Sequence, residues 1–171
     1  MSPEIRNKYQ AIIGLEVHAQ MLTKSKAYSS DINQFGDKPN NNVSIVTMAH
    51  PGSLPKMNNK TIEFAIKLGL ACNAKITQQQ NFSRKNYFYP DLPKGYQITQ
   101  DLTPICTDGE IYIKDDNGNE KPIKLTRIHM EEDAGKSIHD IDIYDTLVDL
   151  NRAGVPLIEI VSEPDLRTSK E

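Results

Sequence analysis

Apolar residues occupy every second position near the start of the chain, at residues 13, 15 and 17 within the stretch 9–20. A period of two is typical of a β-strand whose two faces meet different surroundings. The stretch 9–20 is therefore predicted to be a strand. On this strand Glu16 and His18 project from the same face, because they lie two residues apart.

A period of three to four residues follows at residues 58–73 and predicts a helix. Its apolar residues form one stripe: Ile62, Ala65, Ile66, Gly69 and Leu70. Glu63 and Lys67 lie four apart on the outer face, where they can pair. Asn58 or Asn59 can cap the first turn.

Two strands, at 110–114 and 122–130, are predicted on either side of the turn 115–119. Asn117-Gly118 within this turn is a strong hairpin signal, because both residues tolerate positive φ. The two strands should therefore be antiparallel neighbours.

Three more strands are predicted from apolar content at 146–150, at 155–161 and, inside the long polar loop 23–56, at 43–48. The strands at 146–150 and 155–161 flank a turn at 151–154. One helix among several hairpin-linked strands favours the α+β class with a mostly antiparallel sheet.

The stretch 83–97 is rich in rings and cations but follows neither period. So many aromatic residues disfavour disorder, so we predict an ordered loop. Lys85 and Lys94, set among these rings, would suit contacts with phosphates and bases. The alternative is a structural loop whose lysines are solvated.

Two clusters of polar residues on the predicted strands could bind a metal ion. Glu16 and His18 can reach one ion together, or can lie on a solvated face of the sheet. The acidic run 131–133 either binds a cation or is simply exposed. Alternation places Glu131 on the same face as His129, with Glu132 opposite, so Glu131 is the better candidate ligand.

Glu159 lies within the apolar stretch 155–161. Burying an unpaired carboxylate costs several kcal/mol, so Glu159 must be paired with a cation, bound to metal, protonated or placed at an exposed edge. Carboxylates from three strands and one imidazole would suit Mg²⁺ between nucleotide phosphates, provided that the strands are neighbours.

Composition and motifs exclude several classes of function. The net charge of −3 gives no overall positive field for nucleic acid. Cys72 and Cys106 form neither a disulfide framework nor a zinc ribbon, which favours a reducing cytosol. No apolar run approaches the roughly 20 residues of a membrane span. The stretch 133–137 resembles the end of a P-loop, but Met130 stands where that motif needs glycine.

Four motifs, in this order, resemble the B subunit of the bacterial and organellar aspartyl/glutamyl-tRNA amidotransferase. They are IGLEVH at 13–18, RKNYFYPDLPKGYQ at 84–97, MEEDAGK at 130–136 and PLIEIVSEPD at 156–165. The resemblance covers residues 9–167. It implies that the chain, residues 1–171, is the N-terminal portion of a catalytic cradle related to glutamine synthetase. The rest of the cradle, a helical domain and a tRNA-binding tail would be absent, and the fragment inactive alone.

The resemblance also implies a reaction and its partners. ATP with Mg²⁺ would activate the side-chain carboxylate of Glu-tRNA(Gln) or Asp-tRNA(Asn), and ammonia from a glutaminase (A) subunit would displace the phosphate. A small C subunit would complete the complex, in the bacterial cytoplasm. A non-catalytic alternative is that this region mainly serves as a docking scaffold for the glutaminase subunit.

The same resemblance assigns roles to residues of this chain. Glu16, His18 and Glu131 would form the core that handles metal and phosphate, with Glu159 as a further metal ligand. The nucleotide or acyl substrate would contact a second set of residues: Lys85, Tyr87 and Lys94.

One departure from the family concerns zinc. Some relatives carry a four-cysteine zinc site in the early loop. The corresponding positions here hold no cysteine: Ser29, Asp31, Ser44 and Thr47. No zinc is predicted, because none of these residues supplies a thiolate.

Overall fold

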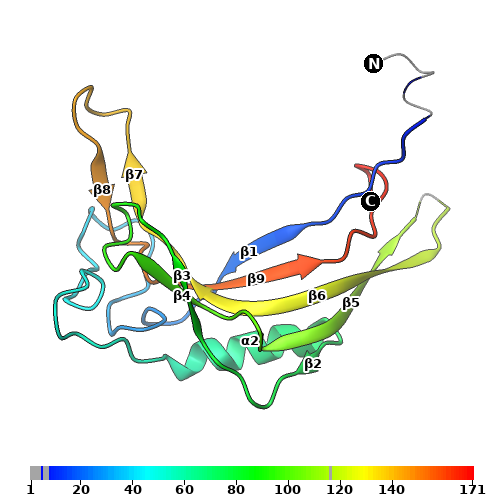
Figure 1. Ribbon diagram of the computed structural model, residues 1–171, viewed down its shortest axis with the longest axis horizontal. Coiled ribbons are helices and arrows are strands. Elements are labelled where there is room, and N and C mark those ends of the chain that lie inside the picture. Colours follow the sequence, from blue (N-terminus) through cyan, green and yellow to red (C-terminus); the bar gives the residue numbers. More distant parts are fainter. Residues whose placement is uncertain (1–4, 6–7, 116) are drawn as a thin grey trace.

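A five-stranded sheet, antiparallel throughout, organises the computed structural model, which describes residue 5 and residues 8–115 and 117–171. In order across the sheet, its strands are β1 (Glu16–Gln20), β9 (Pro156–Ser162), β6 (Glu120–Glu132), β5 (Cys106–Lys114) and β2 (Lys75–Ile76). The helix α2 (Asn59–Ala71) lies under one face, and the opposite face is open (Figure 1). The predicted α+β class is confirmed.

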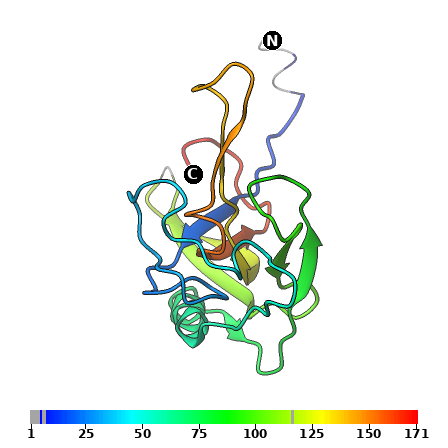
Figure 2. The same ribbon diagram turned by 90° about the vertical axis from the view of Figure 1, so that its left-hand side faces the viewer.

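Two short hairpins flank this sheet. β3 (Ser83–Asn86) pairs with β4 (Tyr96–Thr99), which packs beside β6. β7 (Lys136–Ile138) pairs with β8 (Leu147–Asp149), and this hairpin rises away from the sheet (Figure 2). The predicted loop at 83–97 is ordered, but its ends are strands; four residues are too few to show a clear period.

The register of the central strands aligns polar residues that are distant in sequence. Glu159 on β9 stands opposite His18 on β1 and opposite His129 on β6. Glu131 stands opposite Leu157 in the next row. Directly opposed residues of an antiparallel pair share a face, so these side chains gather on the open side of the sheet.

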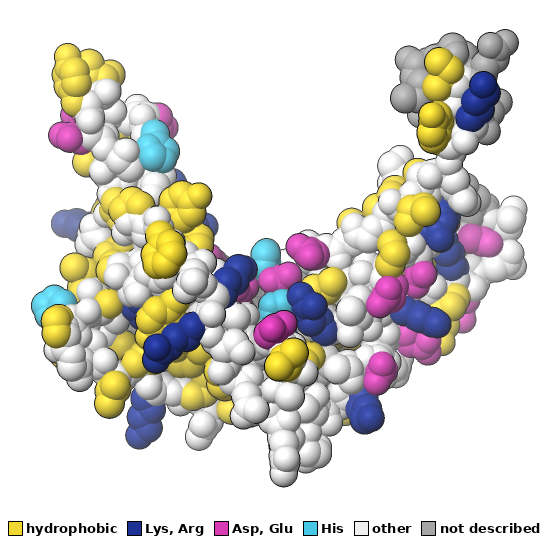
Figure 3. Space-filling view, viewed as in Figure 1, with side chains coloured by type: hydrophobic (Ala, Val, Ile, Leu, Met, Phe, Trp, Pro, Cys, Tyr) yellow, Lys and Arg dark blue, Asp and Glu magenta, His cyan; other side chains and the backbone are white. Residues whose placement is uncertain are grey.

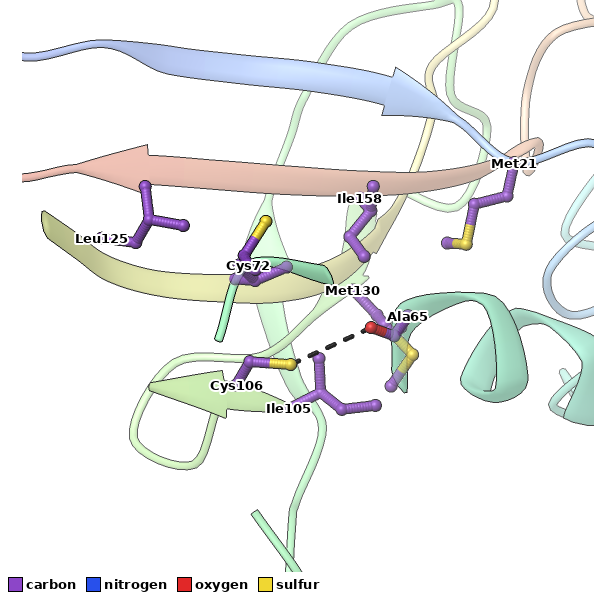
Figure 4. Packing of buried hydrophobic residues seen from close by; sticks show 9 residues of the cluster. Met21, Ala65, Cys72, Ile105, Cys106, Leu125, Met130 and Ile158 are labelled. Carbon is purple, nitrogen blue, oxygen red and sulfur yellow. Dashed lines mark hydrogen bonds between the residues drawn. The ribbon is translucent and has the colours of Figure 1, made fainter. Parts of the chain in front are cut away.

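The other face of the sheet packs on α2 and forms the main core (Figure 4). Met130 and Ile158, which alternate with the acidic residues of β6 and β9, belong to the same buried cluster as Ala65 of the helix. Each of these side chains is almost completely buried. The same alternation that buries the apolar residues thus presents the charged ones to the opposite side.

The helix begins as predicted, since the Asn58 side chain accepts a hydrogen bond from the N–H of Lys60. Glu63 pairs with Lys67 at 2.9 Å, also as predicted. The buried face of the helix is rotated relative to the predicted apolar stripe, however, because Thr61 is buried while Leu70 is 62% exposed.

Other strand predictions were partly right. The hairpin between β5 and β6 closes through Gly118 at φ +83°, as expected, while Asp116 of the predicted turn lies outside the described residues. The strand predicted at 9–20 is confined to Glu16–Gln20, with a single bridge from Ile13 to Leu166 before it. The strands at 146–150 and 155–161 exist as β8 and β9.

The strand predicted at 43–48 is wrong, because this segment is a turn in which the N–H of Met48 donates to Ser44 O. The Asp31 carboxylate stabilises this turn by accepting hydrogen bonds from the Ser44 N–H and the Thr47 hydroxyl. A nonlocal carboxylate thus overrides the local apolar pattern.

Both cysteines are buried and free. Burial raises the pKa of Cys106 to about 11, so its thiol stays protonated near neutral pH. Among the residues that the structure describes, no helix combines the length and apolar character needed to cross a bilayer.

We expect Gly69→Ala to lower the free energy of unfolding by about 1–3 kcal/mol. Alanine is ordinarily the better helix former, but a Cβ here would lie 2.3 Å from Cys106 Sγ and 2.9 Å from Ile76 Cδ1. Urea denaturation measures the change. The Cys106→Ala background is the control, since removing Sγ should shrink the loss; an equal loss in both backgrounds would contradict the proposed clash.

Candidate active site

Three side chains from three neighbouring strands converge on the open face of the sheet. One potential ligand atom from each of His18, Glu131 and Glu159 lies within 4.8 Å of the other two. His18 Nε2 is 3.0 Å from Glu159 Oε2 and 4.0 Å from Glu131 Oε2. The condition set by the sequence, that these strands be neighbours, is met for these three residues.

Burial differs sharply within the group. The Glu131 and Glu159 side chains are 1% and 8% exposed, whereas the His18 side chain is 51% exposed. Glu131 and Glu159 lie on the central strands β6 and β9, and His18 lies on the edge strand β1. The site therefore joins two fixed carboxylates to one accessible imidazole.

Two further residues complete the cluster. Lys85, on β3, donates from Nζ to Glu131 Oε1 at 3.1 Å, with a side chain that is half exposed. His129, buried on β6, lies with Nε2 3.3 Å from Glu159 Oε2. In Figure 3 acidic, basic and histidine side chains gather on the floor of the hollow between the two ends of the molecule.

The environment moves the pKa values of the two carboxyls in opposite directions. Burial raises the pKa of Glu131, and the nearby Lys85 opposes the rise only in part. Burial alone would also raise the pKa of Glu159. The hydrogen bond from His18 and the electrostatic effect of His129 and His18 outweigh burial, so the pKa of Glu159 is lowered. Glu159 is therefore the carboxylate more firmly held in its ionised form.

The spacing of this group fits a divalent cation after small adjustments. An octahedral Mg²⁺ site with bonds of about 2.1 Å places its ligand atoms about 3 Å apart when adjacent and about 4.2 Å apart when opposite. The observed limit of 4.8 Å is slightly wider. His18 can close the difference, because its side chain is on an edge strand and half exposed. Two carboxylates suit Mg²⁺ or Mn²⁺, whereas an imidazole is more usual as a ligand of transition metals.

The remaining predicted site residues lie apart from this group. Glu16 is on the same face of β1 but is not among the ligand atoms that converge. Tyr87 is half-buried, packs against the buried apolar cluster that contains Leu92, and lies with its hydroxyl 3.4 Å from Asp91 Oδ2. Its predicted role, like that of Glu16, remains a prediction.

Lys94 contacts the other face of β6. Its side chain is 7% exposed and donates to the Glu132 carboxylate, between the rings of Tyr28 and Tyr96. The open alternative that the lysines of this loop are solvated is therefore wrong for Lys94.

The alternative that the acidic run 131–133 is merely exposed is also wrong, because Glu131 and Glu132 are among the most buried side chains.

A second buried cation, Lys26, lies near the pair of Lys94 and Glu132. Lys26, with a fully buried side chain, donates to the carbonyls of Asn42 at 2.7 Å and Leu150 at 3.3 Å, and lies 4.0 Å from Asp31 Oδ2. Burial lowers the pKa of Lys26 to about 8. Asp31 also gathers the other three positions at which zinc was considered: Ser29, Ser44 and Thr47.

Sequence reasoning missed the roles of His129 and Lys26. Alternation had placed His129 on the face of Glu131, which was a usable signal. Lys26 gave none, because a lysine in a polar loop is ordinarily solvated.

A hollow of about 490 Å³ lies at the end of β1. Gln20, two residues beyond His18, lines it together with the cationic side chains of Lys136 and Arg152. Gln20 Nε2 also donates to Asp133 Oδ2 at 2.7 Å. Asp37 and Asp149 also line it, so the hollow is polar with charges of both signs.

Comparison with known proteins gives a consistent family. The sequence profile of the GatB/GatE catalytic domain matches residues 11–171. Two proteins named as the B subunit of aspartyl/glutamyl-tRNA(Asn/Gln) amidotransferase, from Thermodesulfovibrio yellowstonii and Pelodictyon phaeoclathratiforme, are each 56% identical over 164 residues. The protein of that name from Clostridium kluyveri is 54% identical over 164 residues. Each match covers 96% of this chain and 34% of the relative, so the chain spans about a third of their length.

We expect Lys26 to make stability rise with pH between about pH 8 and pH 10.5. Its folded pKa is below the unfolded value, so the unfolded chain binds more protons in this window and ΔG of unfolding increases, by up to about 1.4 kcal/mol per pH unit. Below pH 8 the full cost of burying the charge is present.

Denaturant unfolding across this window, compared with Lys26→Met, isolates the contribution. The slope should flatten in Lys26→Met, and it should persist in Lys75→Met, which alters an exposed lysine of β2. Equal slopes in Lys26→Met and the unaltered protein would show that Lys26 is not the source.

Proposed function

This chain belongs to the GatB/GatE catalytic domain family, and on that premise we propose that it carries the catalytic surface of a tRNA-dependent amidotransferase. The reaction is the ATP-dependent phosphorylation of the side-chain carboxylate of Glu-tRNA(Gln) or Asp-tRNA(Asn), followed by amidation. The observation that supports it most is the convergence of His18, Glu131 and Glu159 on an open face.

These three residues would hold Mg²⁺. When bound, such an ion supplies neutralising charge for the phosphates of ATP and for the phosphoryl group in transfer. His18 would then give its Nε2 lone pair to the ion in place of its present hydrogen bond to Glu159. Glu16, on the same face of β1, remains a candidate for a further ligand or for a bound water.

Lys85 supplies the positive charge of the site. Its Nζ donates to Glu131 in the structure, and its half-exposed stem can turn toward an incoming phosphate. Phosphoryl transfer needs positioning and charge neutralisation more than a protein nucleophile, and this cluster provides both. Tyr87 lies on the loop that follows β3 and would border the acyl substrate or nucleotide.

Lys94 would support the nucleotide site indirectly. It holds Glu132 on the far face, and Glu132 Oε1 also accepts the N–H of Ile98 on β4 at 2.8 Å. This pair ties the β3–β4 hairpin, and with it Lys85, to β6. Lys94 is therefore proposed to set the geometry of the cofactor-binding hairpin.

The activated acyl phosphate would react with ammonia, whose nitrogen forms the new C–N bond as phosphate leaves. A glutaminase (A) subunit would produce the ammonia, and a small C subunit would complete the complex. The reaction would take place in the bacterial cytoplasm, where charged tRNA is used.

A docking role is the second candidate. The β7–β8 hairpin carries exposed apolar side chains at its tip, including Ile143 and Tyr144 at 88% and 90% exposure. Exposed apolar groups on a projecting hairpin are typical of a protein interface. This surface lies outside the polar cluster, so the two roles can be tested separately.

Glu131→Gln in the full-length protein, assembled with its partners, should reduce ATP-dependent amidation by at least about 100-fold while glutamine hydrolysis largely persists. The substitution keeps the shape of the side chain but removes the ligand charge. Transamidation of the misacylated tRNA and release of glutamate are measured in parallel. Glu120→Gln, an exposed position of the same strand, is the matched control; normal amidation by Glu131→Gln would refute the site assignment.

Alanine substitution of both Glu16 and His18 separates catalysis from docking. Both side chains are exposed and on an edge strand, so complex assembly should survive while amidation is lost. Gel filtration of the complex and the transamidation assay give the two readouts. Retained amidation would favour the scaffold alternative.

A further inference from the structure

His129 lies between two charged residues on the open face of the sheet. It is 5% exposed, and its ring separates Arg127, two residues earlier on β6, from Glu159 on β9. Arg127 Nε donates to His129 Nδ1 at 3.4 Å, and His129 Nε2 lies 3.3 Å from Glu159 Oε2. Both ring nitrogens therefore face a defined partner.

The Arg127 contact determines where the ring carries its proton. A guanidinium has only donors, so the nitrogen that faces it must present a lone pair. Nδ1 of His129 is consequently unprotonated, and the proton of the neutral ring is on Nε2. That N–H is directed to the side of Glu159, whose carboxylate can only accept.

Glu159 Oε2 is close to two imidazoles at once, with His18 Nε2 at 3.0 Å and His129 Nε2 at 3.3 Å. The two contacts are not equivalent. His18 is half exposed on the edge strand and belongs to the converging ligand group, whereas His129 is buried and outside that group. If His18 gives its Nε2 lone pair to an ion, it can no longer donate from that atom to Glu159.

We propose that His129 is a positioning residue: its Nε2–H, in a tautomer fixed by Arg127, orients the Glu159 carboxylate for a divalent cation. This inference rests on the proposed function, which makes Glu159 a ligand. Carboxylate and imidazole ligands are held by hydrogen bonds from residues behind them, and loss of such a partner costs about 10–100-fold in metal affinity. A ring that merely filled space would have no such effect.

The test uses Mn²⁺ binding to the full-length protein, followed by electron paramagnetic resonance, so that activity is not needed. His129→Asn keeps a polar group near the Nδ1 position but offers no donor near Glu159, and should weaken Mn²⁺ affinity by about 10–100-fold. His129→Gln places an amide N–H near the position of Nε2 and should recover most of that affinity. Far-UV circular dichroism and thermal melting check folding.

Two measurements keep the test decisive if the buried variants fold poorly. Selective ¹⁵N labelling of histidine in the unaltered protein should show His129 protonated on Nε2 and not on Nδ1. Arg127→Met, at a half-buried position, should release the tautomer and weaken Mn²⁺ affinity less than His129→Asn does. A proton on Nδ1 of His129, or equal Mn²⁺ affinity in His129→Asn, His129→Gln and the unaltered protein, would overturn the inference.

Glu131→Gln distinguishes this failure from failure of the metal site itself. If Glu131→Gln weakens Mn²⁺ binding and His129→Asn does not, only the role of His129 is refuted. If Glu131→Gln binds Mn²⁺ as tightly as the unaltered protein does, the metal site and the His129 inference both fall.

Discussion

Three carboxylates are buried on the two central strands, two on the open face of the sheet and one on the opposite face, and the surrounding structure must offset the cost of removing them from water. Glu131, Glu132 and Glu159 are each almost inaccessible to water. Burying an uncompensated carboxylate costs several kcal/mol, so each needs a cation or a hydrogen-bond donor within reach. These partners come from elsewhere: β1 brings His18, and the β3–β4 hairpin and its loop bring Lys85 and Lys94.

Adjacent residues of β6 meet this constraint in two different ways. Glu132 faces Lys94, which is itself buried, and accepts the Ile98 N–H, so its partners are all internal. Glu131, on the other face, is matched by the half-exposed Lys85 and lies 4.0 Å from the half-exposed His18. A cation from solution can replace the partners of Glu131. It cannot reach those of Glu132 without unpacking the hairpin.

Local rules predicted the features that depend on neighbours in sequence. The Asn58 cap, the turn at Gly118 and the opposite faces of Glu131 and Glu132 all follow from spacing and side-chain chemistry within a few residues. The convergence of His18 with Glu159 could only be stated as a condition, because their pairing joins residues 141 apart. The motif resemblance supplied the expectation that this condition would be met.

Local rules failed where a distant polar group decides the conformation. The segment at 43–48 has the apolar content of a strand, but Asp31 binds its backbone and its Thr47 hydroxyl and folds it into a turn. Lys94 lies in a loop rich in aromatic residues and cations, which suggests a ligand site. Its ammonium instead forms an ion pair with the carboxylate of Glu132, 38 residues away in the sequence. Neither outcome is encoded in local periodicity, since both depend on which faces the sheet brings together.

The position of each residue in the sheet also explains why the two carboxylates are held in place while the imidazole can move. Glu159 is paired with His18 of β1 and with His129 of β6, and Glu131 is paired with Leu157 of β9, so neither backbone can shift without breaking ladder hydrogen bonds. His18 is on β1, which is paired on one side only, and its side chain is half exposed. Closing the group around an ion therefore requires movement mainly of the imidazole, while the two carboxylates keep the geometry that the sheet imposes. Three protein ligands leave an ion that takes six oxygen-rich ligands with positions to fill, and because His18 is half exposed, water or phosphate oxygens can complete its shell.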